Sequence, residues 1–215
     1  MINKKLSERD VCTKYITPAI QSAGWDIQTQ VREEVSFTKG RIIVRGKLHS
    51  RGEQKRADYI LYYKSNIPIA IIEAKDNSYS LGAGMQQALN YAETLEIPFV
   101  FSSNGDAFLM HDRTGNAATT ELEIPLDRFP SPNDLWLRYC EWKDIKTEQA
   151  KSTIEMPYYD DGSVRAPRYY QASAINNTIE AVAKGQQRNF VGNGDRHWQN
   201  LYCFPNHLAL MEVRY

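Results

Sequence analysis

Two short apolar runs, separated by turn-forming residues, stand out in the first half of the chain. The runs 59–63 and 69–72 are rich in β-branched and aromatic side chains, which predicts two buried strands. A chain reversal centred between positions 65 and 66 would join them as an antiparallel hairpin. That register sets Asp58 directly opposite Glu73, so we expect both carboxylates at one end of the hairpin.

A helical pattern precedes these strands. Ser7 and Asp10 have the spacing of a capping box, and Gly24 is a natural stop signal. Pro18 inside the pattern predicts a kink or a break, because proline removes a helical hydrogen bond. Glu8 falls in the first turn, where a carboxylate is favourable for the helix dipole whether or not it has a functional role.

A second helix is predicted over 81–95, and Gln87 and Tyr91 are neighbours on a face other than its apolar one. Further on, Asn104-Gly105 between two apolar runs is a strong hairpin signal. Helices and strands that alternate in this way predict an α/β fold: a mixed central β-sheet flanked by helices, with a helical C-terminal extension.

The hairpin end carries the candidate chemistry. Glu73 and Lys75 are two residues apart, so they lie on the same face of their strand, close to Asp58. Two carboxylates are a usual protein contribution to a Mg²⁺ site, and a lysine can position a water or stabilise charge developing on a phosphate. The residues therefore predict a metal-dependent phosphodiester-cleaving site; the plainer interpretation is an exposed ion pair at a strand end.

The spacing Asp58-x(14)-Glu73-x-Lys75 resembles the PD-(D/E)xK nuclease core, with Ala57 at the proline position of that name. More specifically, residues 6–115 resemble the N-terminal endonuclease domain of type I restriction enzyme R (motor) subunits. The stretches that support this resemblance, besides the catalytic triplet, are Ser7-Glu8, Gln87 to Tyr91, Phe101 to Gly105, Pro167 to Gln171 and Ala174-Ile175.

The resemblance implies a DNA endonuclease with Asp58, Glu73 and Lys75 as catalytic residues and the two acids as Mg²⁺ ligands. Glu8, Gln87 and Tyr91 are the implied supporting residues. The implied substrate is double-stranded DNA. Full-length members use ATP and act with methyltransferase and specificity subunits, which decide where DNA is cut.

Composition says less about the function than these motifs do. The chain has 215 residues with 26 basic and 26 acidic side chains, so it is not uniformly DNA-coating. Basic residues nevertheless precede Asp58, and we expect DNA contacts from Arg41, Arg45, Lys47, Arg51, Lys55 and Arg56. The plainer interpretation of each is a solvated loop residue. No long apolar run or secretory signal is present, and the three cysteines are widely spaced, so we expect a cytoplasmic protein without membrane contact.

For the domains, we expect an endonuclease domain over 1–151, a linker over 152–167 and the start of a first helicase-like domain over 168–191. There the resemblance makes Gln171 the remnant of a nucleotide-binding site. The glycine-rich phosphate loop that should follow is absent from 192–200. We therefore expect no ATP hydrolysis, and a truncated chain that cleaves DNA weakly or not at all by itself.

A reading-frame shift would explain the missing loop. Back-translated and read one base later, 192–200 can spell A-T-G-T-G-T-G-K-T, which is such a loop. We hypothesise that 192–215 is a frameshifted, non-native tail. Two alternative functions stay open from the sequence: a stand-alone PD-(D/E)xK repair or junction nuclease, and a catalytically silent DNA-binding fragment.

Overall fold

The computed structural model describes residues 5–38, 43–45, 48–50, 54–158, 167–186, 188–193 and 197–202. The chain divides into two compact units, Met1–Lys143 and Asp144–Tyr215, which are considered separately. Among the described residues, no helix has the length and apolar character needed to cross a membrane.

A six-stranded mixed sheet forms the centre of the first unit, with strand order β1-β4-β5-β6-β7-β8. Only β5 and β6 pair in parallel within this sheet; the other neighbours are antiparallel. The strands are β1 (Val31–Thr38), β4 (Gln54–Tyr62), β5 (Pro68–Ala74), β6 (Phe99–Ser103), β7 (Ala107–Asp112) and β8 (Glu121–Pro125), and a separate pair is formed by β2 (Ile43–Arg45) and β3 (Leu48–Ser50).

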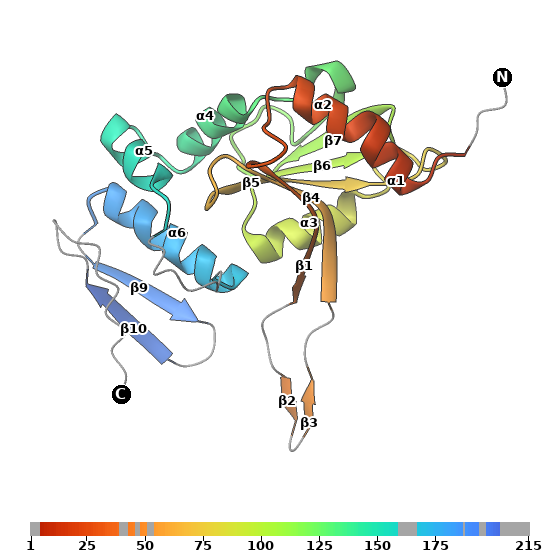
Figure 1. Ribbon diagram of the computed structural model, residues 1–215. Helices are drawn as coiled ribbons and strands as arrows, with labels where there is room; N and C mark the ends of the chain where they lie inside the picture. Colours follow the sequence, from red (N-terminus) through yellow and green to blue (C-terminus); the bar gives the residue numbers. More distant parts are fainter. Residues whose placement is uncertain are drawn as a thin grey trace. The chain divides into compact units, whose positions relative to one another are not determined.

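Helices cover both faces of this sheet (Figure 1). The N-terminal helical segment lies on one side and α3 on the other. The helical elements of the unit are α1 (Glu8–Val11), the π-helix η1 (Cys12–Ile16), α2 (Thr17–Ser22), α3 (Met85–Leu95), the 3₁₀-helix η2 (Leu126–Arg128) and α4 (Pro132–Trp142). The predicted α/β class with a mixed, helix-flanked sheet is confirmed.

The core is centred on β5, whose residues from Ile69 to Ala74 are all buried. This strand lies between β4 and β6 and has helices on both faces, which explains its continuous apolar run. Phe99, Phe101 and Phe108 are fully buried beside it. Each such side chain contributes about 1.5–3 kcal/mol by leaving water, so the strand that carries Glu73 is firmly held.

The N-terminal helical segment begins with the predicted capping box, in which the Ser7 side chain accepts from the Asp10 amide. The break expected near Pro18 takes the form of a π-helical turn, Cys12–Ile16, which ends two residues before the proline. Proline cannot donate a helical hydrogen bond, and the widened turn accommodates this without ending the helix.

Both predicted hairpins are present. Tyr59 pairs with Ile72 and Ile60 with Ile71, as a reversal between positions 65 and 66 requires. The second hairpin joins β6 and β7 through Asn104-Gly105, and Gly105 has φ of +93°, a conformation that favours glycine.

The second unit contains α5 (Glu148–Glu155), α6 (Tyr169–Ala183) and the antiparallel pair β9 (Arg188–Asn193) and β10 (His197–Tyr202). Here the structure differs from the expected organisation. The unit begins at Asp144, and α5 runs through the expected boundary at 151/152 because Thr147 caps it and Ala150 and Ile154 are buried on one face. The C-terminal part is not purely helical, since β9 and β10 include the described part of the expected tail.

Candidate active site

Asp58 and Glu73 lie at the same end of the β4–β5 hairpin, because the pairing of Tyr59 with Ile72 continues to place position 58 opposite position 73. Asp58 is half-buried, and its Oδ2 accepts a hydrogen bond of 2.8 Å from the amide of Ala74. Glu73 is only 2% exposed. Its Oε2 is buried and has no hydrogen-bond partner among the described residues.

Lys75 joins the two acids from the end of β5. Its Nζ lies 3.2 Å from Oε1 of Glu73 and 3.3 Å from Oε1 of Gln87. A third carboxylate approaches from α1, where Oε1 of Glu8 lies 3.6 Å from the same Nζ. The ammonium is therefore surrounded by acceptors from three elements, which restricts where it can point.

Gln87 connects this group to α3. Its Nε2 donates to Oε1 of Glu73 and also to the Tyr91 hydroxyl at 3.1 Å, while its Oε1 accepts from Lys75. One amide thus holds the carboxylate and the ammonium together, and Tyr91 helps fix which way the amide faces. The predicted catalytic and supporting residues converge in one place.

Burial dominates the electrostatics of the site. It raises the pKa of Glu73 from 4.5 to about 7, and the nearby Asp58 carboxylate adds to the rise. It also raises the pKa of Asp58, against the Ala74 amide and Lys75. Burial lowers the pKa of Lys75, but the carboxylates, Glu73 foremost, outweigh it and leave that pKa raised. Strongly shifted acids in one cluster are typical of functional sites.

The donor set fits a hard divalent cation. Mg²⁺ takes one or two protein carboxylates and keeps its remaining positions for water and phosphate oxygens. Oε2 of Glu73 is a buried acceptor that has no hydrogen-bond partner within the described ranges of the chain, and a cation would satisfy it. Across the described part of the chain, no three or more His, Cys, Asp or Glu side chains are grouped as metal ligands.

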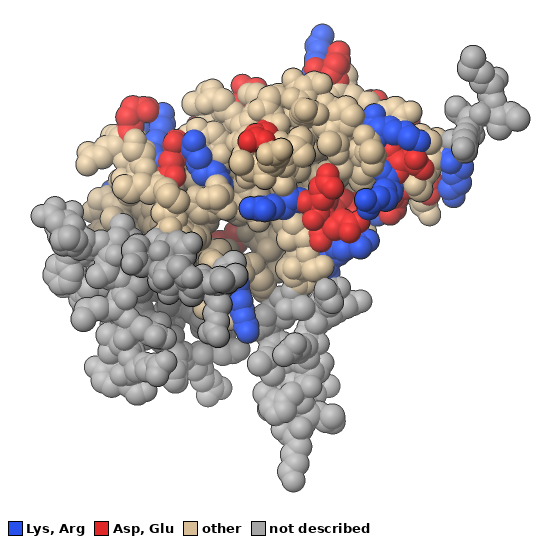
Figure 2. All heavy atoms as spheres, in the orientation of Figure 1, with Lys and Arg blue, Asp and Glu red and all other residues tan. Residues whose placement is uncertain are grey.

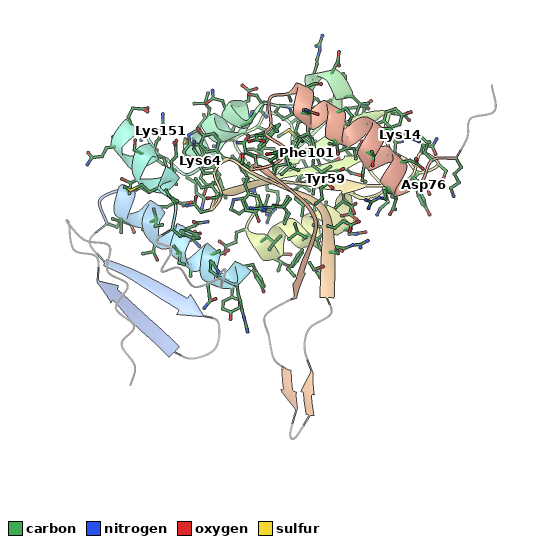
Figure 3. The ribbon with its side chains drawn as sticks, viewed as in Figure 1. Lys14, Tyr59, Lys64, Asp76, Phe101 and Lys151 are labelled. Atoms are coloured by element: carbon green, nitrogen blue, oxygen red, sulfur yellow. The ribbon has the colours of Figure 1, made fainter. Side chains whose placement is uncertain are left out.

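The contacts that hold the helix of Glu8 in place were not evident from the sequence. The amide of Leu6 donates to Oδ1 of Asn77, and Lys5 pairs with Asp76 at 3.5 Å, so the loop after β5 binds the chain just before α1. Asp76 lies next to the start of α1 in Figure 3. The helix that carries Glu8 is thereby fixed near Lys75.

Comparisons with known proteins identify relatives of this chain. The family described as "Type I restriction enzyme R protein N terminus (HSDR_N)" matches residues 27–125. The type I restriction enzyme EcoAI endonuclease subunit of Escherichia coli is 50% identical over 184 residues, which is 85% of this chain and 23% of that protein. A solved structure described as a fragment of an HsdR subunit of a type I restriction enzyme from Vibrio vulnificus YJ016 has 39% identity and a TM-score of 0.72, covering 87% of this chain and 34% of that one.

The chain belongs to the type I restriction enzyme R family. It spans about a quarter of the length of the Escherichia coli relative and a third of the Vibrio vulnificus chain. The family match begins after α1 and α2, so Glu8 lies outside it, whereas Asp58, Glu73, Lys75, Gln87 and Tyr91 lie within it.

The expected DNA-contacting residues of this R-family chain are only partly described. Lys55 places its Nζ 5.3 Å from the centre of the Tyr91 ring, so it belongs to the surroundings of the site. Arg56 is exposed and pairs with Glu34 at 3.7 Å. Arg41, Lys47 and Arg51 lie outside the described residues, as does the side chain of Arg45.

Acidic side chains lie among the basic ones near the site. Figure 2 shows Lys and Arg side chains next to Asp and Glu side chains around α1. Glu34 accepts from Arg9 at 3.3 Å as well as pairing with Arg56, and it has φ of +51° in β1 at the position opposite Asp58. Nothing in the local sequence pattern signalled this interruption of β1.

Two buried residues beside Glu73 were also missed. Ser102 on β6 and Gly84 directly before α3 both approach the Glu73 side chain. Gln171, predicted as a nucleotide-site remnant, is exposed in the first turn of α6, where its Oε1 accepts from the Arg168 amide at 3.0 Å. Its predicted role stays a prediction.

Proposed function

We propose that this chain carries the nuclease domain of a type I restriction enzyme R subunit and hydrolyses DNA phosphodiester bonds with a divalent metal ion. The observation that carries the proposal is the convergence of two half- or fully buried carboxylates, a lysine and the Gln87 amide at one end of β4 and β5. Family membership supports the same conclusion.

Asp58 and Glu73 would hold the ion. Bound there, Mg²⁺ would polarise a phosphate oxygen and lower the pKa of a bound water. Glu73 combines a buried position with an Oε2 that no other described residue hydrogen-bonds, which costs free energy unless a cation or a proton is present. Glu73 is almost fully buried, so a phosphate group would approach the site from the side of the half-buried Asp58.

Lys75 would act on the scissile phosphate. Its ammonium is a compact charge that can stabilise the negative charge of the transition state or position the attacking water. The amide oxygen of Gln87 accepts from this ammonium, and the amide nitrogen of Gln87 donates to Glu73. Lys75 and Glu73 therefore keep their relative position before DNA binds. Such preorganisation is where most catalytic stabilisation arises.

The test is nicking of supercoiled plasmid in Mg²⁺ or Mn²⁺. We expect Asp58→Ala, Glu73→Ala and Lys75→Ala to remove cleavage, whereas Glu93→Ala, an exposed acid on α3, should retain it. Activity that survives all three site substitutions would refute the assignment. Mn²⁺ binding to the wild type but not to Asp58→Ala separates a competent site from a silent DNA-binding fragment.

The partners of the full-length family are part of the proposal. We infer that this region acts on double-stranded DNA in a cytoplasmic complex with methyltransferase and specificity subunits, which choose the site. Gln171 is the proposed remnant of the motor's nucleotide site, and without the phosphate-binding loop we expect no ATP hydrolysis by this chain. A phosphate-release assay in the presence of DNA tests that expectation.

A further inference from the structure

The side chain of Ser102 fastens the segment before α3 to the central sheet. Ser102 is fully buried on β6, and it is the register partner of Glu73 on the parallel neighbour β5. Its hydroxyl donates to the carbonyl of Leu81 at 2.8 Å and accepts from the amide of Gly84 at 3.1 Å. Both hydrogen bonds therefore hold the residues that lead directly into α3.

Gly84 allows α3 to start in contact with Glu73. A Cβ at this position would lie 3.0 Å from Cγ of Glu73 and 3.0 Å from Oγ of Ser102. Its φ of −86° is available to any residue, so the requirement for glycine here is the space and not the backbone conformation. The atoms in contact are the stem of a buried carboxylate and a hydroxyl that is already bonded, so neither can yield easily.

The first turn of α3 carries this contact to the active site. The amide of Ala88 donates to the carbonyl of Gly84 at 3.0 Å, and Gln87 lies within this turn. Because a helical turn is rigid, a displacement of Gly84 moves the Gln87 amide relative to Glu73 and Lys75. Both hydrogen bonds from Gln87 depend on that position.

We propose that Ser102 and Gly84 are positioning residues of the nuclease site, because together they set how close α3 lies to Glu73 and hence where Gln87 meets Glu73 and Lys75. This inference rests on the proposed function. Gly84 lies against the aliphatic stem of Glu73, but among the described residues neither Ser102 nor Gly84 hydrogen-bonds to its carboxylate or to Lys75; each acts through the placement of α3.

The neighbouring residue Ser103 provides a matched control. It is also fully buried on β6, and its hydroxyl donates to the carbonyl of Ala107 at 2.7 Å and accepts from the amide of Gly105 at 3.2 Å. These bonds hold the β6–β7 turn and not α3. Ser102→Ala and Ser103→Ala therefore remove equivalent hydrogen bonds, and we expect similar losses of stability from both.

Only the first substitution should change the active site. Ser102→Ala is expected to lower the single-turnover cleavage rate roughly 10- to 100-fold at saturating Mn²⁺ with DNA affinity unchanged, because small misplacements of a positioned group have effects of this size. It should also shift the side-chain amide resonances of Gln87 in the metal-free chain. Ser103→Ala should leave the rate and these resonances as in the wild type.

A glycine pair repeats the comparison without removing a hydroxyl. Gly84→Ala should reproduce both effects, whereas a Cβ at Gly82 meets only Cδ2 of Leu109, the flexible end of a side chain, at 3.1 Å. Gly82→Ala is therefore the control. If Ser102→Ala does not fold, the two glycine variants decide the question alone.

Equal rates and equal Gln87 resonances for Ser102→Ala and Ser103→Ala would overturn the positioning role and leave the proposed nuclease intact. A wild-type chain that neither binds Mn²⁺ nor nicks plasmid would instead refute the proposed function, and the inference with it. A rate loss and a resonance shift confined to Ser102→Ala and Gly84→Ala would support the inference.

Discussion

Glu73→Gln should change how the stability of the metal-free chain depends on pH. The carboxyl group is nearly inaccessible, its Oε2 has no partner in the described structure, and its pKa is raised from 4.5 to about 7. A carboxyl whose folded pKa is raised binds its proton more tightly in the folded than in the unfolded chain. Its contribution is therefore fully favourable below pH 4.5, is lost as pH rises, and is absent above about pH 7.

The magnitude follows from the two pKa values. Each pKa unit corresponds to about 1.4 kcal/mol, so a change from 4.5 to about 7 amounts to roughly 3 kcal/mol, most of which is lost between roughly pH 5 and 8.5. Glutamine keeps the size of the side chain but does not titrate. Costs of the substitution that do not depend on pH cancel when each protein is compared with itself at the two pH values.

Urea unfolding in the presence of a chelator measures this difference, with amide exchange in β5 as a local probe. The wild type should lose about 2 to 3 kcal/mol more than Glu73→Gln on going from about pH 5 to pH 8.5. Mg²⁺ should restore the wild type at high pH but not the variant, because only the ionised carboxylate binds the ion. Parallel pH profiles for the two proteins would show that Glu73 is not a buried acid of raised pKa, and the electrostatic account of the site would be wrong.

Three further outcomes are expected. Gln87→Ala should slow plasmid cleavage roughly 10- to 100-fold in single-turnover assays, because the amide that holds Glu73 is lost. Gln86, the exposed neighbour of Gln87 on α3, provides the control, and Gln86→Ala should have no effect. Equal cleavage rates for the two variants would contradict the role of the Gln87 amide. Lys55→Ala should weaken DNA binding and lower the salt slope by about 1 in anisotropy titrations, while Lys64→Ala, which removes a matching cation 5.2 Å from the Tyr63 ring, should change neither. Sequencing the gene across the codons for 185–215 and beyond should find a helicase-type frame one base out of register, and the absence of such a frame would refute the frameshift hypothesis.

The local parts of the site were predictable from sequence. The turn between the two apolar runs predicted the β4–β5 pairing at the site, which brought Asp58 to Glu73. It did not predict the one-residue register shift between Leu61 and Tyr62, nearer the turn. The spacing of Gln87 and Tyr91 predicted that they are neighbours, and they share a hydrogen bond of 3.1 Å. Each of these inferences depends only on short-range geometry.

The remaining features depend on packing between distant segments. The contact of Gly84 with Glu73 and Ser102 depends on how the start of α3 packs against β5 and β6. The spacing of residues along the sequence does not predict that packing. The edge strand β8 was missed because only Ile124 in it is buried, so it has little apolar signal. The expected linker began too late, since α5 draws its stability from Ala150 and Ile154, too short a pattern to separate from a polar connection.

Of the catalytic and supporting side chains, all but Glu8 come from a single uninterrupted stretch, Asp58 to Tyr91, which contains parts of β4 and α3 and the whole of β5. Such a stretch closes through short loops, so its members are brought together at small entropic cost and at an early stage of folding. Glu8 alone arrives from elsewhere, on a helix tied down through Asn77. Local opening of that helix would withdraw one acid and leave Asp58, Glu73, Lys75, Gln87 and Tyr91 assembled, whereas these five would separate only when the central sheet and α3 themselves open.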